Sequence, residues 1–444
     1  MRGREGRPIE RPYPQANAPP PKSTSRSFNF PSKEPATAAL SSRTAMAALL
    51  RWLWFRLGAP SKKAGMAPRV QRLLRHAAPS KESPWPDLPP ELLGLVLLRT
   101  PSHSDRVHLR AVCCSWRSSV QLQPPPPLLS WFAFRDGTFL SLSDGTVRRL
   151  PVPGYHDVSY RVSTGSMFFL VHRHGHQEGR WCSLMNPFSG EITPLPINPD
   201  HLDLRNLRDI RKVVPGRVVA VLTRTKRNSK NVTVFAGGPQ GTMTMEWAPP
   251  VNSHAADIAT FRGKLYVLTA ERDHQPELHV LDVGDEGIRS VQCIPGAPRD
   301  DGEVYQFYYY LVPSGSRLLL VRRIADVEPV GMTRFDVFQA VDLSGGRGRW
   351  SRVDTLMEHA LFVSQNCSRS VLAGGQSCGG AREDCIYFMS ELVGIRNIPQ
   401  DFLHSGVYNM KEQTVARLPS ETSALSVAGL WGPWSRTWLF PPEV

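Results

Sequence analysis

The chain is organised around one stretch, Trp85-Pro86-Asp87-Leu88-Pro89-Pro90-Glu91-Leu92-Leu93-Gly94-Leu95-Val96-Leu97-Leu98, which continues as Leu109-Arg110-Ala111-Val112-Cys113-Cys114-Ser115-Trp116-Arg117. Its apolar residues recur every three or four positions, which predicts two or three short amphipathic helices. Helices this short carry more apolar surface than they can bury against one another. We therefore expect residues 85–120 to form a helical module whose apolar surface needs a partner.

The first helix of this module is expected to follow Asp87, which can cap it, and to tolerate Pro89 and Pro90 in its first turn. Its expected apolar stripe consists of Leu88, Leu92, Leu95 and Val96, widened by Leu93 and Leu97.

A second helix is expected from Ser102-His103-Ser104-Asp105, which resembles a capping box with Asp in place of the usual Glu. The residues that give this helix its apolar spacing are Leu109, Val112, Cys113, Trp116 and Val120. Four consecutive prolines at 124–127 stop any helix, so we place a stiff spacer at 121–127.

From residue 128 to residue 440 the pattern changes to short runs that alternate with a period of two. Turn signals such as Asp136-Gly137, Ser189-Gly190 and Arg262-Gly263 separate these runs, and no helical pattern of ordinary length interrupts them. The clearest runs are 131–134, 166–170, 218–222, 264–268, 277–281, 317–321 and 384–389.

A weak repeat organises these strands. An apolar residue or Trp, often followed by Pro, recurs at Leu150-Pro151, Leu195-Pro196, Trp247, Ile294-Pro295, Trp350 and Leu418-Pro419. The spacing fits four-stranded propeller blades with variable loops, so we expect a β-propeller of about six blades, with seven possible. The last strand, 436–440, is expected to pair near Trp131 and close the ring.

The helical stretch resembles an F-box. The resemblance rests on Leu-Pro-Pro-Glu-Leu-Leu at 88–93 and on Leu-Arg-x-Val-Cys-x-x-Trp-Arg at 109–117, at the spacing of that family. It implies docking on a Skp-type adaptor within a cullin ubiquitin ligase. The residues expected to bind the adaptor, or to build the module, are Leu88, Pro89, Leu92, Leu93, Val96, Leu97, Leu109, Val112 and Trp116.

The remaining chain is similar to the KIB-type β-propeller of a plant family of F-box proteins. The motifs that carry this resemblance are 126–129, 186–191, 261–266, 360–366 and 384–388, and the glycine-rich segment 374–381 departs from it. The resemblance implies reception of an unidentified target protein, with no catalysis, cofactor or metal. The expected fold is mainly β: an all-α F-box module, then a propeller over 128–440.

The charge is concentrated in the N-terminal tail. The net charge is +14, but residues 1–80 hold fifteen Lys and Arg against three acids, which leaves about +2 for the rest. The tail is rich in Pro, Ser and Arg, so we expect it to be disordered. A basic tail on a nearly neutral body argues against nucleic acid as a partner.

Seven scattered cysteines and the lack of a secretory signal indicate a reducing compartment, the cytoplasm, the nucleus or both. Residues 45–57 are helical and basic in pattern, but too short and charged to span a membrane. An organellar transit peptide is one interpretation of this tail, and a dispensable extension preceding a start at Met46 or Met66 is the other. The transit interpretation is the less favoured one, because a ligase-docking element would have no use inside an organelle.

Several patterns imitate catalytic or metal sites. Residues 375–379 match G-x-S-x-G, followed by acids and His404, but that elbow needs a strand before it and a helix after it. His172, His174 and His176 alternate, so in a strand all three would face one side and could bind zinc. A solvated hairpin tip explains them better. Cys367, Cys378 and Cys385 lack zinc spacing. Residues 224–230 form a basic loop, expected at a hairpin tip.

A rival hypothesis is an enzymatic or organellar β-propeller in which 85–120 is only a structural helical element. Turnover of a small ester, or loss of the tail in an organelle, would support this rival. Co-purification with the adaptor and a cullin would support the F-box hypothesis.

Overall fold

The structure is a computed structural model, and it describes residues 88–98, 100, 103–122, 130–134, 137–143, 145–150, 158–173, 180–197, 209–224, 230–238, 241–271, 275–284, 286–296, 306–325, 333–343, 347–373, 381–389, 405–418 and 437–441. The predicted tail at 1–80, the predicted cap at Asp87 and the proline run at 124–127 lie outside these residues.

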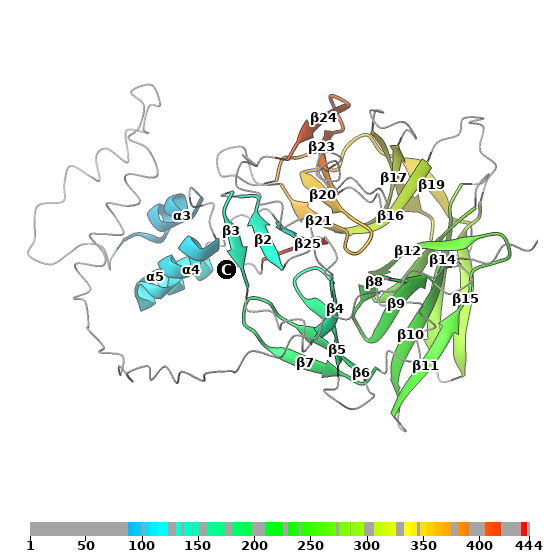
Figure 1. Ribbon diagram of the computed structural model, residues 1–444. Coiled ribbons are helices and arrows are strands. Elements are labelled where there is room, and N and C mark those ends of the chain that lie inside the picture. The colour runs from blue at the N-terminus through cyan, green and yellow to red at the C-terminus, as the bar shows by residue number, and fades with distance from the viewer. Residues whose placement is uncertain are drawn as a thin grey trace, which may run out of the picture. The chain divides into compact units, whose positions relative to one another are not determined.

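Three short helices form the helical module: α3 (Pro90–Leu98), α4 (His103–Ala111) and α5 (Cys114–Leu122) (Figure 1). The single helix expected from 102 to 120 is wrong, because the chain breaks at Val112 and Cys113. There the sulfur of Cys113 accepts a hydrogen bond from the backbone N–H of Trp116 at 3.4 Å and so caps α5. α5 packs against both α3 and α4 and ends two residues inside the expected spacer.

The residues described between 130 and 441 form six sheets around a common centre (Figure 1). From the inside outward, the first three are β25 (Thr437–Leu439), β1 (Trp131–Ala133), β2 (Thr138–Ser141) and β3 (Val147–Arg149); β4 (Val158–Ser163), β5 (Phe168–Arg173), β6 (Arg180–Met185) and β7 (Ile192–Leu195); and β8 (Ile210–Val214), β9 (Val218–Arg224), β10 (Lys230–Gly238) and β11 (Gly241–Trp247).

The other three sheets follow in chain order around the ring. They are β12 (His254–Phe261), β13 (Lys264–Ala270), β14 (Glu277–Gly284) and β15 (Gly287–Ile294); β16 (Gln306–Ser314), β17 (Arg317–Ala325), β18 (Arg334–Val341) and β19 (Arg349–Arg352); and β21 (Arg369–Leu372), β20 (His359–Val363), β22 (Cys385–Phe388), β23 (Gly406–Asn409) and β24 (Thr414–Arg417). The chain is therefore mainly β, with a six-bladed propeller.

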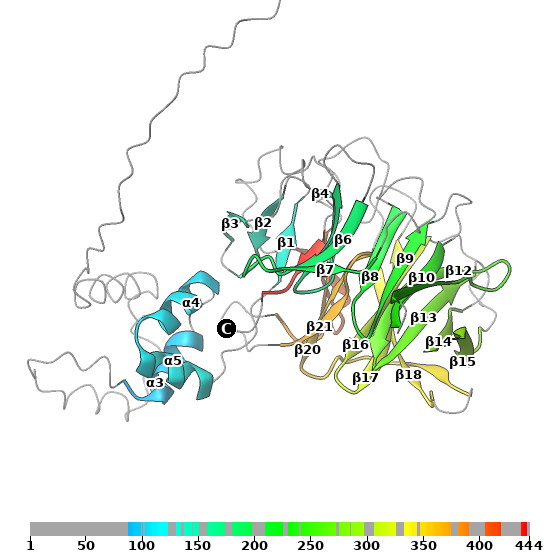
Figure 2. The same cartoon turned by 90° about the horizontal axis from the view of Figure 1, so that it is seen from below.

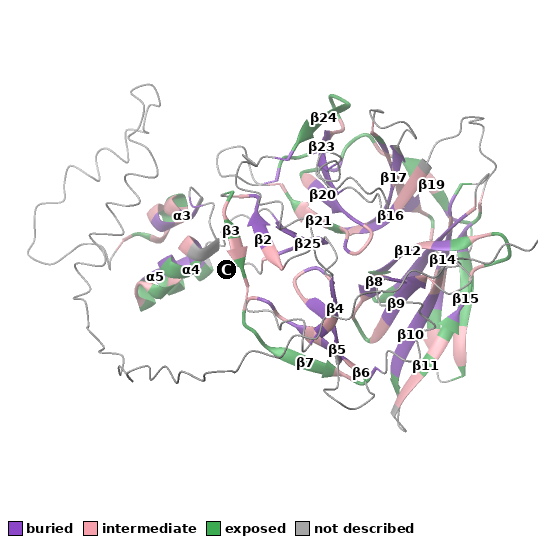
Figure 3. Ribbon diagram, in the orientation of Figure 1, coloured by how far each residue is buried: buried purple, intermediate pink, exposed green. Residues whose placement is uncertain are grey.

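The predicted repeat marks the outer strand of each blade. Each of the six apolar endings lies within, or directly after, one of β3, β7, β11, β15, β19 and β24, so the sequence-based prediction of about six blades is confirmed. The outer strands carry the most exposed residues of the blades (Figure 3), and β21, the innermost strand of the sixth sheet, is also partly exposed. All four residues of β24 are exposed, whereas all four of β22 are buried.

The apolar core lies between neighbouring sheets rather than in one central body. Six clusters of buried side chains occur, one at each junction between consecutive sheets. Sheets packed on both faces bury both sets of alternating side chains, which explains continuous apolar runs such as Leu318–Val321. The junction of the sixth and first sheets joins Phe362 and Tyr387 to Phe132 and Trp438.

The predicted closure of the ring is confirmed. β25, the red strand in Figure 2, lies beside β1 and pairs with it in antiparallel register. Trp438 is the partner of Phe132 in this register. Because the two ends of the propeller share one sheet, the inner edge of β1 is covered and the C-terminal strand holds the first blade to the end of the chain.

The sixth sheet departs from the regular pattern. β20 pairs with β22 in parallel and with β21 in antiparallel register, so the chain turns back before entering β22. Asp384 directly precedes β22, has a φ of 53° and is buried. Its carboxylate accepts hydrogen bonds from Thr355 Oγ1 at 2.9 Å and from the Leu356 N–H at 2.6 Å, and it pairs with Lys411 Nζ at 2.9 Å.

Asp384 is expected to stabilise the fold at neutral pH and to lose this effect in acid. Burial alone raises the pKa of this carboxyl, but the bonds from Lys411, Leu356 and Thr355 outweigh it and hold the pKa below its usual value. A lowered folded-state pKa contributes stability above the unfolded value, about 3.9, and loses it as pH falls through the folded value. Asp384→Asn should cost about 1–3 kcal/mol in urea unfolding at pH 7.

The control for this prediction is Glu383→Gln. Glu383 is exposed and contacts the same Lys411 at 3.5 Å, so its loss should change the unfolding free energy little. The difference between wild type and Asp384→Asn should shrink as the pH is lowered below about 4. An equal effect of both substitutions, or a difference independent of pH, would contradict the role of Asp384.

Candidate functional site

α3 carries apolar side chains on all of its faces, and the module covers only one of them. Leu93 and Leu97 are buried, whereas Leu92 and Val96 are half-buried and Leu95 is 47% exposed. The side that the module buries is therefore Leu93 with Leu97, whereas the expected stripe of Leu88, Leu92, Leu95 and Val96 stays accessible. A helix that is apolar all round is normally covered all round.

The nine residues predicted to bind the adaptor or to build the module separate into two groups. Leu93, Leu97, Leu109 and Trp116 are each at most 2% exposed and form the interior of the module, together with Val120. The other five remain accessible: Leu88, Leu92, Val96 and Val112 are half-buried and Pro89 is exposed. Their assignment to adaptor binding stays a prediction, and the accessible group is where it can be tested.

Two further apolar residues of the module are accessible. Leu95 on α3 and Val107 on α4, the latter 44% exposed, were not among the predicted site residues. The sequence contained a signal for Leu95, which belongs to the expected apolar stripe of this helix. We call Leu92, Leu95 and Val96 the α3 surface.

Polar contacts hold the connection between α3 and α4 in place. Thr100 Oγ1 donates to the carbonyl of Val96 at 2.8 Å, and the buried Arg106 donates from Nε to the carbonyl of Thr100 at 2.9 Å. Both bonds satisfy carbonyl groups near the end of α3. The α3 surface is thus part of an ordered unit.

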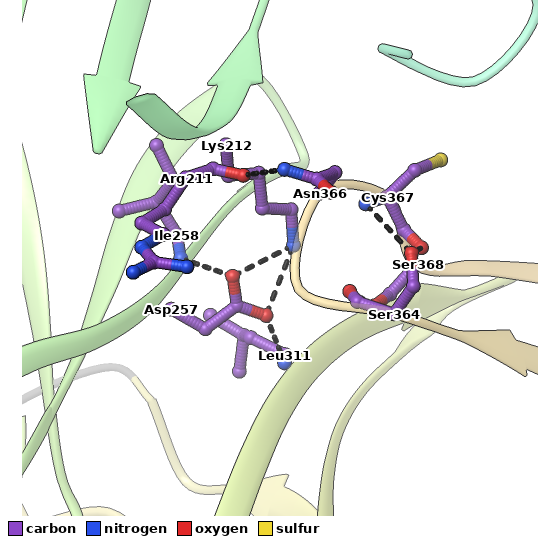
Figure 4. Close-up of polar contacts among 9 residues, drawn as sticks. All are labelled: Arg211, Lys212, Asp257, Ile258, Leu311, Ser364, Asn366, Cys367 and Ser368. Carbon is purple, nitrogen blue, oxygen red and sulfur yellow. Dashed lines mark hydrogen bonds and ion pairs between the residues drawn. The ribbon is translucent and has the colours of Figure 1, made fainter. Parts of the chain in front are cut away.

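At the centre of the propeller, a buried ion pair joins three blades. Lys212 of β8 donates from Nζ to both carboxylate oxygens of Asp257 in β12, at 2.8 and 2.9 Å (Figure 4). The same carboxylate accepts the N–H of Ile258 at 2.8 Å and the N–H of Leu311 in β16 at 2.7 Å. Burial raises the pKa of Asp257, and the ammonium of Lys212 and the two N–H groups oppose that rise.

A turn of the sixth sheet crosses the centre of the ring. The residues between β20 and β21 reach β8 of the third sheet, where Asn366 Nδ2 donates to the carbonyl of Arg211 at 2.5 Å. Arg211 in turn donates to Gln365 Oε1 at 3.0 Å. Within the turn, the hydroxyl of Ser364 donates a hydrogen bond to the carbonyl of Cys367 at 2.7 Å. Neither this turn nor the ion pair was among the predicted sites.

Among the patterns that imitate catalytic or metal sites, some lie outside the described residues and one is placed differently from the prediction. The segment 374–380, His404 and most of the basic loop 224–230 lie outside the described residues, as do His174 and His176. The placement of His172 in a solvated turn is wrong: it lies in β5, buried, with Nε2 2.7 Å from Ser183 Oγ and its ring stacked on Trp181. Within the described ranges, no three His, Cys, Asp or Glu side chains are grouped to hold a metal.

In the part of the chain that the structure describes, no helix has the length and apolar character needed to cross a membrane.

The similarity to solved structures is distant, and no curated protein matches the chain. One structure is the GH43B protein of a Bacteroides ovatus xyloglucan PUL, at 14% identity and a TM-score of 0.23, covering 44% of this chain and 40% of that one. Another is the α-L-arabinofuranosidase PaAbf62A from Podospora anserina, at 10% identity and a TM-score of 0.26, covering 46% and 70%.

Two family models match the chain directly. The F-box domain matches residues 85–126, which include all three described helices, and the KIB1-4 beta-propeller matches residues 139–409, more than half of the chain. F-box domains typically bind Skp-type adaptors in cullin ligases, and an F-box joined to a propeller is an arrangement of the substrate-receptor type. The chain therefore belongs to the family of F-box proteins that carry a KIB1-4 β-propeller.

Proposed function

We propose that this chain is the substrate-receptor subunit of an Skp–cullin–F-box ubiquitin ligase. The F-box module docks on the Skp-type adaptor, and the propeller binds a target protein. Ubiquitin transfer is performed by other subunits, so the chain itself has no catalytic residue. Its contribution is proximity, because it raises the effective concentration of the target near the ligase.

The observation that carries this proposal is the α3 surface. After Glu91, α3 carries only apolar residues and a glycine, yet α4 and α5 leave Leu95 47% exposed and Leu92 and Val96 half-buried. Covering an apolar side chain of this size stabilises a complex by about 1.5–3 kcal/mol relative to leaving it in water. A partner with a complementary apolar groove is the natural cover, as in other helix-in-groove complexes.

The propeller supports the second half of the proposal because it is a self-contained ring. Each of its six junctions has a buried cluster, and β25 closes the ring against β1. Such a rigid scaffold can present loops to another protein without rearranging its core. We place the protein in the cytoplasm or the nucleus, where the ligase subunits would meet it.

The proposal is tested by co-purification of the full chain with a Skp-type adaptor and a cullin. Leu92→Asp combined with Leu95→Asp should weaken adaptor binding by about 100-fold or more, because two charges would have to lose water in an apolar interface. Binding is measured by calorimetry with purified adaptor, and circular dichroism checks that helical content is retained.

The matched control is Ile192→Asp combined with Val415→Asp. These residues are 40% and 49% exposed on the outer strands β7 and β24, so they receive the same charges at similar exposure in the propeller. Adaptor binding by this control should equal that of wild type. Unchanged binding by the Leu92/Leu95 variant, with its helices intact, would refute docking through α3.

A further inference from the structure

A pocket of about 220 Å³ lies where the inner strands of five blades converge. Its lining comes from the turn after β4, from β8 and the turn after it, from β12, from β16, and from the turn between β20 and β21. The residues that matter for its chemistry are Thr164, Lys212, Thr260, Leu311, Asn366 and Cys367.

Lys212 gives this pocket a buried ammonium group with one N–H donor that Asp257 does not use. Its ammonium has three N–H donors, and two of them go to Asp257. The carboxylate of Asp257 accepts four hydrogen bonds in total, from Lys212, Ile258 and Leu311, which fills its usual capacity. Asp257 therefore holds the lysine in place, and the third donor of Lys212 is available to a ligand.

The turn between β20 and β21 supplies the opposite wall. Figure 4 shows the ammonium of Lys212 between Asp257 and the turn that carries Asn366 and Cys367. Asn366 uses Nδ2 to bond the carbonyl of Arg211, which fixes the amide at the edge of the pocket. The hydroxyl groups of Thr164 and Thr260 add further polar atoms from other blades.

Among the described residues that line the pocket, Lys212 is the one with a charged side chain, and its counter-ion Asp257 is not part of the lining. Lys212 and Arg369 act on the Cys367 thiol as positive neighbours, and Asp257 acts as a negative one. The thiol itself adds no negative charge at neutral pH, because burial raises the pKa of Cys367 to about 11. An anionic group in this pocket would meet the third N–H donor of Lys212, while Asp257 offsets the charge of the lysine.

We propose that the axial pocket binds a small carboxylate group on an apolar stem, with the carboxylate accepting from Lys212 and the stem against Leu311, Pro313 and Ile258. A cavity of about 150 Å³ accepts a benzene ring, so the volume suits an organic acid of that size. The carboxylate can belong to a free organic acid or to the C-terminus of a peptide, and the chemistry recognised is the same. This binding is independent of adaptor docking.

The test is calorimetric titration of the purified full chain at pH 7. The probes are acetate, lactate and benzoate, each compared with its neutral carboxamide, and the peptide Gly-Ala-Val-Leu with a free or amidated C-terminus. At least one carboxylate should bind with a Kd below about 1 mM, and its amide should bind at least about tenfold more weakly. If only the organic acids bind, the ligand is a small molecule. If only the peptide with a free C-terminus binds, the ligand is a protein C-terminus.

Two variants keep the proposal falsifiable. Thr260 lines the pocket but is exposed, so Thr260→Phe should place a ring in the pocket and abolish ligand binding. Thr414→Phe, on the exposed strand β24, should leave ligand binding unchanged. Lys212→Met with Asp257→Asn removes both charges together and should also abolish binding. The proposal is overturned if no carboxylate probe binds with a Kd below about 1 mM, if amides bind equally well, or if Thr260→Phe binds like wild type.

Discussion

Asp257→Ala should lower the free energy of unfolding of the propeller by about 3–5 kcal/mol, because it leaves the ammonium of Lys212 buried without a counter-ion. Lys212 and Asp257 are each about 5% exposed, so water cannot replace the lost partner. The substitution also removes the acceptor for the N–H groups of Ile258 and Leu311, which lie in different blades. Urea unfolding at pH 7, followed by tryptophan fluorescence, measures the change.

The double variant Lys212→Met with Asp257→Asn distinguishes the cost of an unpaired charge from the cost of lost packing. Both charges disappear together, and the Asn amide oxygen still accepts an N–H from the backbone. Replacing a buried pair as a unit generally costs far less than removing one partner. The double variant should therefore be more stable than Asp257→Ala, and equal instability of the two would contradict the charge-based explanation.

The propeller was predictable because its repeating chemistry is local. Each blade ends in an apolar or Trp residue at the outer strand, and turns such as Arg262-Gly263 mark the hairpins. Both residues of that turn have positive φ, 49° and 74°, as a two-residue hairpin requires. Signals of this kind recur along the sequence and need no knowledge of distant contacts.

The contents of the propeller axis could not be predicted in the same way. Lys212 and Asp257 are 45 residues apart, and the packing of one blade against the next brings their strands together. The parallel pairing of β20 with β22 likewise depends on a detour of the chain that no period-two pattern announces. The available hint was a charged residue inside an apolar strand, as Asp257 is between Ala256 and Ile258.

In the helical module, the sequence predicted the apolar surface but not which side is covered. Leu92 with Val96 and Leu93 with Leu97 both have the four-residue spacing of a helical stripe. Only the packing of α5 against α3 decides that Leu93 and Leu97 are buried. The same ambiguity is informative about function, since the uncovered pair is the surface available to an adaptor.

Trp438→Ala should destabilise the propeller by about 3–5 kcal/mol, because it removes the largest buried side chain of the closing strand. Trp438 is fully buried in β25, its Nε1 donates to the carbonyl of Val363 at 3.0 Å, and its ring meets Phe132 and Phe362 edge-on. Its own carbonyl accepts from Ser163 at 2.7 Å. One residue thus joins the first, second and sixth blades, and urea unfolding measures its loss.

The comparison that isolates ring closure is Trp350→Ala. Trp350 also donates its Nε1 to a backbone carbonyl, that of Pro276 at 2.8 Å, but it is half-buried on the outer strand β19. Because β19 does not close the ring, Trp350→Ala should lower the free energy of unfolding by about 1–3 kcal/mol. The other blades should stay protected from proteolysis. Trp438→Ala should instead expose all blades to the protease together, since an opened ring exposes unpaired strand edges on both sides of the break. Equal costs for the two tryptophans, or cleavage confined to the first blade after Trp438→Ala, would show that closure by β25 does not couple the blades.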